Sequence, residues 1–277
     1  MNSLKDKKCL ITGASSGLGL ELTKLFILAE AEVIMLCRDE EKSMAIINNL
    51  RKDYPNAKIQ LELADLSSLK SLQTFTEDFT KRHSSLDILI NNAAVLKTRM
   101  TKTDDGFESM FQVNFLAPFI LTNALIDLLK SGHNPQILNI ALPPENLRLN
   151  FDDLQSLNSF KPMENLMRTK LCFFLFSIEL ADRLNNAGIK VITGVPNNRP
   201  FKTNLGREMP FFMKMVMTLI SMKTEKIAIN IPSVLLKNDI RNGYVFKGQN
   251  AVSLTPYWQN SEVRELLWED TEQLLIN

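Results

Sequence analysis

The glycine-rich stretch Thr12-Gly13-Ala14-Ser15-Ser16-Gly17-Leu18-Gly19 has the composition of a turn that binds phosphate groups. The apolar run Cys9-Leu10-Ile11 precedes it, and residues 20–26, which follow, carry apolar side chains at helical spacing. Glycines let the backbone approach a ligand closely, and the free N–H groups at a helix N-terminus favour a pyrophosphate. The order of strand, glycine turn and helix therefore predicts a dinucleotide site.

Further polar groups occur where later apolar runs end. Arg38, Asp65 and Asn91 each close or follow such a run, and another run ends at Ala141. In a parallel sheet, ligands bind beyond the carboxyl ends of the strands. We therefore expect these positions to lie at one edge of a sheet, together with the glycine turn.

The elements that position these residues follow from hydrophobic periodicity. Strands are predicted at residues 9–11, 31–37, 58–63, 86–90, 136–141, 189–195 and 244–246. Helices are predicted at residues 20–26, 40–50, 67–82, 105–129, 164–184, 225–236 and 261–275, with Ser67 or Ser68 capping the third of them. Nearly continuous apolar strands that alternate with helices are typical of a parallel sheet covered on both faces. The prediction is a single-domain, doubly wound α/β fold of the Rossmann type over residues 1–277.

Composition excludes several classes of protein. The net charge of +1 over 277 residues predicts no surface for nucleic acid. Cys9, Cys37 and Cys172 lie far apart in apolar contexts, which indicates buried free thiols and no metal site. Met1 leads almost directly into the first strand, and residues 211–220 are too short to span a bilayer and contain a lysine. The expectation is a cytoplasmic protein with no transmembrane segment.

Several motifs, taken in order, resemble those of the short-chain dehydrogenases/reductases. They are Thr12-Gly13-x-x-x-Gly17-x-Gly19, Asp65-Leu66, Asn91-Asn92-Ala93-Ala94, Asn114 and Lys170. Three further stretches look like the retinol-dehydrogenase-like branch, namely Phe151-Asp152-Asp153-Leu154, Thr203-Asn204-Leu205-Gly206-Arg207 and Leu267-Trp268-Glu269. The resemblance covers almost the whole chain.

This resemblance implies a nicotinamide dinucleotide as cofactor. Arg38 stands where the family binds the adenosine ribose, and arginine suits a 2′-phosphate, which favours NADP(H) over NAD. The alternative is a surface ion pair of Arg38 with Asp39 or Glu40. Asp65 would accept from the adenine amino group or cap the next helix, and Asn91 would lie against the adenine ribose or form a turn. The expected cofactor-binding residues are Gly13, Ser15, Ser16, Gly17, Leu18, Gly19, Arg38, Asp65, Leu66, Asn91, Ala93, Lys170, Pro196 and Thr203.

The resemblance also implies a set of catalytic side chains, of which only part is present. The family uses a tyrosine as general acid or base, a lysine one helical turn later, a carbonyl-polarising serine and an asparagine. Lys170 and Asn114 match the lysine and the asparagine. Leu166 stands at the tyrosine position, and Ala141 or Leu142 stands at the serine position. Leucine and alanine carry no transferable proton, so the proton relay is expected to be impaired.

Three functions are compatible with this pattern. The first is an NADP(H)-binding protein with an impaired proton relay that acts as a sensor, scaffold or partner subunit. The second is an active oxidoreductase on a hydrophobic carbonyl, alcohol or enone, with a low-pKa Lys170 or Glu164 as the acid, or with a C=C bond that needs none. The third is a structural dimer partner without nucleotide.

Assembly and substrate access are also implied by the family. The family pairs through its two long central helices, here 105–129 and 164–184, and residues 171–176 are apolar on more than one face. We therefore expect a homodimer or tetramer. Residues 196–222 stand where the family has its substrate lid, with shallow membrane contact by residues 211–220 as the alternative.

Overall fold

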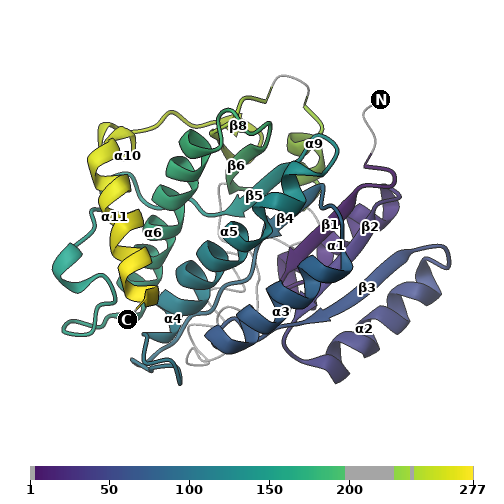
Figure 1. The fold of residues 1–277 in the computed structure, drawn as a ribbon, viewed down its shortest axis with the longest axis horizontal. Helices are drawn as coiled ribbons and strands as arrows, with labels where there is room; N and C mark the ends of the chain where they lie inside the picture. Colours follow the sequence, from purple (N-terminus) through teal and green to yellow (C-terminus); the bar gives the residue numbers. More distant parts are fainter. Residues whose placement is uncertain (1–3, 197–227, 238–239, 277) are drawn as a thin grey trace, which may run out of the picture.

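The apolar runs form one eight-stranded sheet in the computed structural model, which describes residues 4–196, 228–237 and 240–276 (Figure 1). The strands are β1 (Lys8–Thr12), β2 (Glu32–Cys37), β3 (Lys58–Leu63), β4 (Ile88–Asn91), β5 (Gln136–Ile140), β6 (Lys190–Val195), β7 (Tyr244–Lys247) and β8 (Asn250–Ala251). Their order is β3-β2-β1-β4-β5-β6-β7-β8, with β1 to β7 parallel and β8 antiparallel to β7. The predicted fold class is confirmed.

Helices cover both faces of this sheet. They are α1 (Gly17–Leu28), α2 (Glu40–Asp53), α3 (Leu69–Arg82), α4 (Ser109–Phe111), α5 (Ala117–Lys130), α6 (Pro162–Arg183), α9 (Asn230–Leu235), α10 (Pro256–Gln259) and α11 (Ser261–Ile276). In β1, Leu10 packs in a core with α3, α5, α6 and α11, whereas Cys9 and Ile11 pack in a second core with α1, α2 and α9. Successive side chains of a strand point to opposite faces, so strands buried on both faces must be apolar throughout.

The strand order places a ligand crevice between β1 and β4. The chain runs outward from β1 to β3 and then returns to the other side of β1 at β4. At such a reversal the connections leave the carboxyl ends of two neighbouring strands in opposite directions, which opens a crevice. The glycine turn after β1 and the Asn91-Asn92 pair at the end of β4 lie at this point.

Some elements differ from the predicted ones. The long helix predicted from residue 105 begins at Ser109, and its start includes a wider π-helical turn, Gln112–Leu116, between α4 and α5. The helix-capping residue before α3 is Ser68, whose side chain accepts a hydrogen bond from the backbone N–H of Ser71. The short strand β8 and helix α10 were not predicted, because two and four residues are too few to show a periodicity. Residues 225–227 of the predicted sixth helix lie outside the described residues.

The C-terminal helix α11 packs against α6. The ring of Trp268 lies 5.0 Å from that of Phe119 and 5.5 Å from that of Phe176, and the Arg183 guanidinium lies 4.0 Å above it. Arg264 donates to Asp182 at 2.7 Å. An apolar side of α6 that we expected a second subunit to cover is therefore buried within the same chain.

Candidate functional site

The glycine turn after β1 is built so that α1 begins close to β1. Gly13 and Gly17 have φ values of +66° and +54°, which favour glycine. Gly19 packs against the turn itself, since a Cβ there would lie 2.3 Å from the Gly13 carbonyl oxygen. The residue that precedes α1, Ser16, makes no side-chain hydrogen bond to the helix. The first N–H groups of α1 therefore lack a side-chain cap, as a phosphate-binding helix requires.

Thr12 and Asn92 join the glycine turn to the end of β4. The Thr12 hydroxyl accepts hydrogen bonds from the backbone N–H groups of Asn92 and Ala93, both at 3.0 Å. The Asn92 side-chain amide donates to the Thr12 carbonyl at 2.9 Å. Neither Thr12 nor Asn92 was among the site residues predicted from sequence, although the Asn-Asn pair was the available signal. Their bonds hold the two sides of the crevice at a set separation.

Other predicted residues of the turn lie in or next to the core. Leu18 is buried against the α1 side of the sheet. Ser15 lies beside the thiol of Cys37, and burial raises the pKa of that thiol above its usual value. Cys9, Cys37 and Cys172 are all buried free thiols, as predicted.

Asn91 directs its side chain into the protein interior. Its amide donates at 2.9 Å to both the Thr122 hydroxyl and the Asn139 side-chain oxygen, and Asn139 donates at 2.8 Å to Ser177. This network joins β4, β5, α5 and α6. The Asn91 oxygen has no partner among the described residues. Asn91 and Leu66 both line a cavity of about 10 Å³. The side chain therefore braces the sheet beneath the crevice.

Arg38 and Asp65 lie together at the ends of β2 and β3. The Arg38 guanidinium is exposed, and its Nη1 lies 4.0 Å from the Asp65 carboxylate. The alternative pairing of Arg38 with Asp39 or Glu40 is not present among the ion pairs of the described residues. Asp65 also accepts from the Ser67 backbone N–H at 2.9 Å and from the Ser67 hydroxyl at 2.6 Å. The exposed cation thus keeps free donors at the edge of the sheet.

Lys170 reaches from α6 to the end of β5. Its Nζ donates to the Ile140 carbonyl at 3.2 Å, and the side chain is half-buried with the ammonium enclosed. Burial disfavours the charged form and lowers the pKa of Lys170 from 10.5 to about 8. Among the described residues, no charged group contributes to this shift.

Asn114 lies in the π-helical turn and binds the chain that follows β4. Its side-chain oxygen accepts from the Val95 N–H at 2.7 Å, and its amide donates to the Val95 carbonyl at 3.0 Å and to the Thr169 hydroxyl at 3.2 Å. π-Helical turns are frequent at functional sites. Asn114 therefore connects the loop after β4 to α6 one residue before Lys170.

The positions of the expected tyrosine and serine are apolar. Leu166 is 4% exposed and packs with Leu96 and Met110, and Ala141 is 1% exposed. Leu142 is half-buried in the same core as α5 and α6. The described residues therefore place hydrocarbon at both positions.

The remaining predicted site residues lie toward the end of β6. The Pro196 carbonyl accepts from the Asn230 side-chain amide at 3.0 Å. Thr203 and the rest of the expected lid, residues 197–222, lie outside the described residues, as does the 211–220 stretch. Glu164, the alternative acid, is exposed and paired with Lys161 at 3.1 Å.

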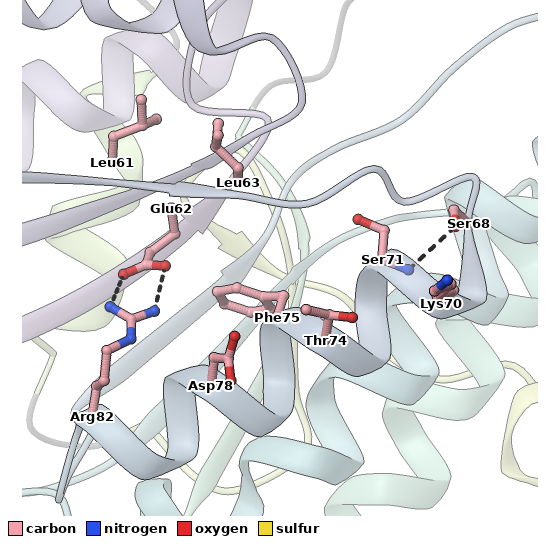
Figure 2. A pocket seen from close by; sticks show the side chains of 10 residues that line it. All are labelled: Leu61, Glu62, Leu63, Ser68, Lys70, Ser71, Thr74, Phe75, Asp78 and Arg82. Atoms are coloured by element: carbon pink, nitrogen blue, oxygen red, sulfur yellow. Dashed lines mark hydrogen bonds and ion pairs between the residues drawn. The ribbon is translucent and has the colours of Figure 1, made fainter.

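A groove of about 600 Å³ lies elsewhere, at the outer edge of the sheet between β3 and α3 (Figure 2). Glu62 and Arg82 form a two-bond ion pair across it, with both N–O distances at 2.7 Å. None of its lining residues is among the predicted site residues. The groove is therefore separate from the crevice at the end of β1.

Comparison with known proteins identifies the class that this fold and crevice define. Residues 7–142 match the model of the short chain dehydrogenase family. Retinol dehydrogenase 13 of Mus musculus is 30% identical over 286 residues, which cover 99% of this chain and 85% of that protein. Human retinol dehydrogenase 14 is 32% identical over 291 residues, which cover 97% of this chain and 86% of that protein. The chain belongs to the short-chain dehydrogenase/reductase family, in its retinol-dehydrogenase-like branch.

Solved structures have the same fold. An uncharacterised protein from Mycobacterium paratuberculosis superimposes with a TM-score of 0.74 at 25% identity, over 99% of this chain and 95% of that one. Pseudomonas aeruginosa RhlG, in an active-site complex with NADP, gives a TM-score of 0.69 at 21% identity, over 89% of this chain and 96% of RhlG. At 21% identity, the likeness to RhlG supports the fold alone.

Two findings contradict the cytoplasmic location predicted from the sequence. The relatives include proteins named for retinol and polyprenol, which are lipid alcohols that dissolve in membranes. Human polyprenol dehydrogenase is 31% identical over 195 residues, which cover 69% of this chain and 59% of that protein. Helix Ser109–Lys130 is also long and apolar enough to cross a membrane, although 72% of its most apolar window is buried in the fold. The prediction of a cytoplasmic location was wrong, because it considered only the start of the chain and residues 211–220.

Proposed function

We propose that this chain binds NADP(H) and acts through that binding, as a sensor, scaffold or partner subunit, with an impaired proton relay. The observation that carries the proposal is the contrast within one crevice. The glycine turn and Arg38 offer N–H donors and a cation, whereas Leu166 and Ala141 are buried and apolar. A site that retains its binding groups without its proton donors favours ligand binding over turnover.

The nucleotide would be held by groups from six places along the edge of the sheet. The uncapped N-terminus of α1 suits the pyrophosphate, with Ser15 and Ser16 beside it. Arg38 would bind the 2′-phosphate, and Asp65, whose carboxylate lies 4.0 Å from the Arg38 guanidinium, would accept from the adenine amino group. The backbone from Asn91 to Ala93, with Leu66, would line the adenosine ribose. Lys170 would bind the nicotinamide ribose, and Pro196 and Thr203 would lie near the nicotinamide. Membership of the short-chain dehydrogenase family supports a nicotinamide nucleotide in this crevice.

The missing hydroxyls account for the expected loss of turnover. A positioned general acid contributes about 10²–10⁴-fold to a rate, and a donor that polarises the carbonyl about 10²–10³-fold. These effects are not additive when the groups act as a unit. With hydrocarbon at Leu166 and at Ala141 or Leu142, most of this help is absent.

A second candidate is an active oxidoreductase on a hydrophobic carbonyl, alcohol or enone. The observation in its favour is the pKa of about 8 at Lys170, which makes its ammonium a better proton donor at neutral pH than an exposed lysine. The apolar surroundings of Leu166 suit a hydrophobic substrate. The names of the retinol dehydrogenase relatives point to the same substrate class.

Titration of the full chain with NADPH, followed by nicotinamide fluorescence, tests the proposal. We expect saturable binding and only residual consumption of NADPH with a panel of apolar aldehydes, ketones and enones. Efficient turnover would replace the first function with the second. If the chain binds neither NADPH nor NADH, the third function named in the sequence analysis remains, that of a structural dimer partner without nucleotide.

The preference for NADP(H) is tested by Arg38→Ala. We expect a loss of NADPH affinity of about 10- to 100-fold, because a charge-assisted hydrogen bond is worth about 1.5–3 kcal/mol, with NADH affinity unchanged. Lys52→Ala, which removes an exposed cation from the end of α2, is the matched control. Equal losses for the two nucleotides in Arg38→Ala would assign this arginine a structural role.

We further propose that residues 1–277 form a single nucleotide-binding domain, with residues 196–222 as its substrate lid, and that the chain is a homodimer or tetramer. Because α11 already covers one side of α6, the contact would use the outer face of α5, where Ala124 is exposed. Light scattering at micromolar concentration tests this, and a monomeric mass would contradict it.

A further inference from the structure

Strand β3 forms the outer edge of the sheet, and among the described residues no strand pairs with its outer side. The Arg51 guanidinium donates to the Ile59 carbonyl at 3.1 Å, so the backbone of Ile59 faces outward. The N–H and C=O groups of alternate residues face the same side of a strand, so those of Leu61 and Leu63 face outward as well. An exposed edge of this kind can pair with a further strand.

The two ends of β3 differ in their protection against such pairing. At the start, the exposed Lys58 is paired with Asp6 at 2.8 Å, and charged side chains are a usual protection of an edge. At the end, Glu62 turns toward α3 to pair with Arg82, on the opposite side of the strand from Leu63 (Figure 2). Leu63 is 41% exposed. The end of the strand is therefore the better site for pairing.

The groove of about 600 Å³ lies along this end of β3, which supplies one of its walls. The other wall is one face of α3, whose lining residues recur at helical spacing: Lys70, Ser71, Thr74, Phe75, Asp78 and Arg82 (Figure 2). When an extended peptide adds to a strand edge, main-chain hydrogen bonds give affinity and pockets for alternate side chains give specificity. The groove offers both, because it combines an outward-facing backbone with a helix face.

The charges along the groove select the kind of peptide. Lys70 lies at one end and has no ion pair among the described residues. Asp78 lies nearer the other end, and its partner Lys81, 3.9 Å away, does not line the groove. Glu62 and Arg82 neutralise each other through two hydrogen bonds. The groove is therefore positive near Lys70 and negative near Asp78.

The separation of these two charges sets the spacing of the ligand. Lys70 and Asp78 are eight positions apart on α3, which corresponds to about 12 Å. An extended chain covers this distance in about four residues. Side chains at positions 1, 3 and 5 of a strand point to one face, so the middle one would lie over Thr74 and Phe75. The pattern that fits is acidic, apolar and basic at alternate positions.

We propose that the end of β3 and the facing side of α3 dock an extended segment of a partner protein with this pattern. The segment adds antiparallel to β3, since such pairs are slightly more stable than parallel ones. Its acidic residue then precedes its basic residue, because Lys70 lies beyond the carboxyl end of β3. The intervening side chains lie on the same face as Leu63. This docking goes beyond nucleotide binding, since the groove contains none of the residues assigned to the nucleotide.

Fluorescence anisotropy of a labelled peptide with the full chain tests the docking. The probe is Ser-Glu-Val-Leu-Thr-Lys-Val-Thr-Gly, and we expect saturable binding. N-methylation of the two residues that flank its lysine should weaken binding about tenfold or more, because their N–H groups face β3. N-methylation of its leucine and lysine, whose N–H groups face solvent, is the matched control and should leave binding unchanged. Equal effects of the two modifications, or no saturation up to about 1 mM, would overturn the proposal.

A charge reversal tests the assigned end of the groove. Lys70→Glu should weaken binding about three- to tenfold, because an exposed attraction becomes a repulsion. Replacing the glutamate of the peptide by lysine should restore binding to this variant. Lys161→Glu, which reverses an exposed cation on α6 outside the groove, should change nothing. Failure of the lysine peptide to restore binding would contradict the proposed pattern. Lys70 is exposed, so the variant is expected to fold.

Two further measurements separate this proposal from its alternatives. If the chain without peptide is a dimer that Leu63→Lys converts to a monomer, the edge pairs with a second copy and the peptide proposal is overturned. A parallel titration with NADPH distinguishes docking from the proposed nucleotide binding. Binding of NADPH without binding of the peptide overturns the docking alone, and binding of the peptide without either nucleotide overturns the nucleotide proposal alone.

Discussion

Leu166→Tyr is expected to raise NADPH-dependent reduction of apolar carbonyl compounds by about 10²- to 10⁴-fold, the usual contribution of a positioned general acid. Leu166 lies one helical turn before Lys170 on α6, so a hydroxyl introduced there comes near the ammonium that would lower its pKa. Adding Leu142→Ser to this variant supplies a donor for the carbonyl and should raise the rate further. The measurement is NADPH consumption under saturating nucleotide.

Leu166→Phe is the matched control for this prediction. It introduces the same ring without the hydroxyl, in a position that is buried against Leu96 and Met110. Both variants should cost about 1–3 kcal/mol of unfolding free energy from overpacking, so that only the hydroxyl distinguishes them. An equal rate in the two variants would show that proton transfer does not limit turnover, and would weaken the proposed impairment.

Gly19→Ala is expected to lower NADPH affinity by about 10²-fold or more. An alanine Cβ at this position would lie 2.3 Å from the Gly13 carbonyl oxygen and 2.7 Å from the Asn92 amide, so α1 or the turn must move. A displacement of the helix N-terminus removes donors from the pyrophosphate, and each lost 1.4 kcal/mol is a factor of ten in affinity. Calorimetric titration with NADPH measures the loss, and thermal unfolding shows how much of the population remains folded.

Gly188→Ala separates this steric effect from backbone strain. Gly188 has a φ of +71°, but no atom lies within 4 Å of an added Cβ. Alanine should therefore cost about 1 kcal/mol of stability from its left-handed conformation without any change in affinity. If Gly19→Ala behaves in the same way as Gly188→Ala, the turn does not bind the pyrophosphate as proposed.

The sequence predicted the sheet well because the signal for each strand is local. Runs such as Cys9-Leu10-Ile11 must be apolar on both faces in a covered parallel sheet, and they are visible without knowledge of their neighbours. The turn residues Gly13 and Gly17 are equally local, because their positive φ values restrict the choice of residue. The absence of a hydroxyl at Leu166 is also a property of the sequence.

Other features depend on contacts between segments far apart in the chain. Thr12 and Asn92 are separated by 80 residues and meet only because β1 and β4 are neighbours in the sheet. The same pairing explains why Asn91 directs its amide to Thr122 and Asn139 in the interior. No periodicity in the sequence indicates such partners.

The amino-acid sequence by itself determined the order of strands and helices, the glycine turn, and the apolar residues at the positions where a tyrosine and a serine were expected, since each depends on residue types within a few positions. Only the tertiary structure decided that α11 covers α6, that Arg38 faces Asp65, and that Lys170 lies enclosed beside Ile140 with a pKa of about 8. The physical reason is that burial and electrostatic environment are set by all the elements that surround a side chain, and these are brought together only when the chain folds.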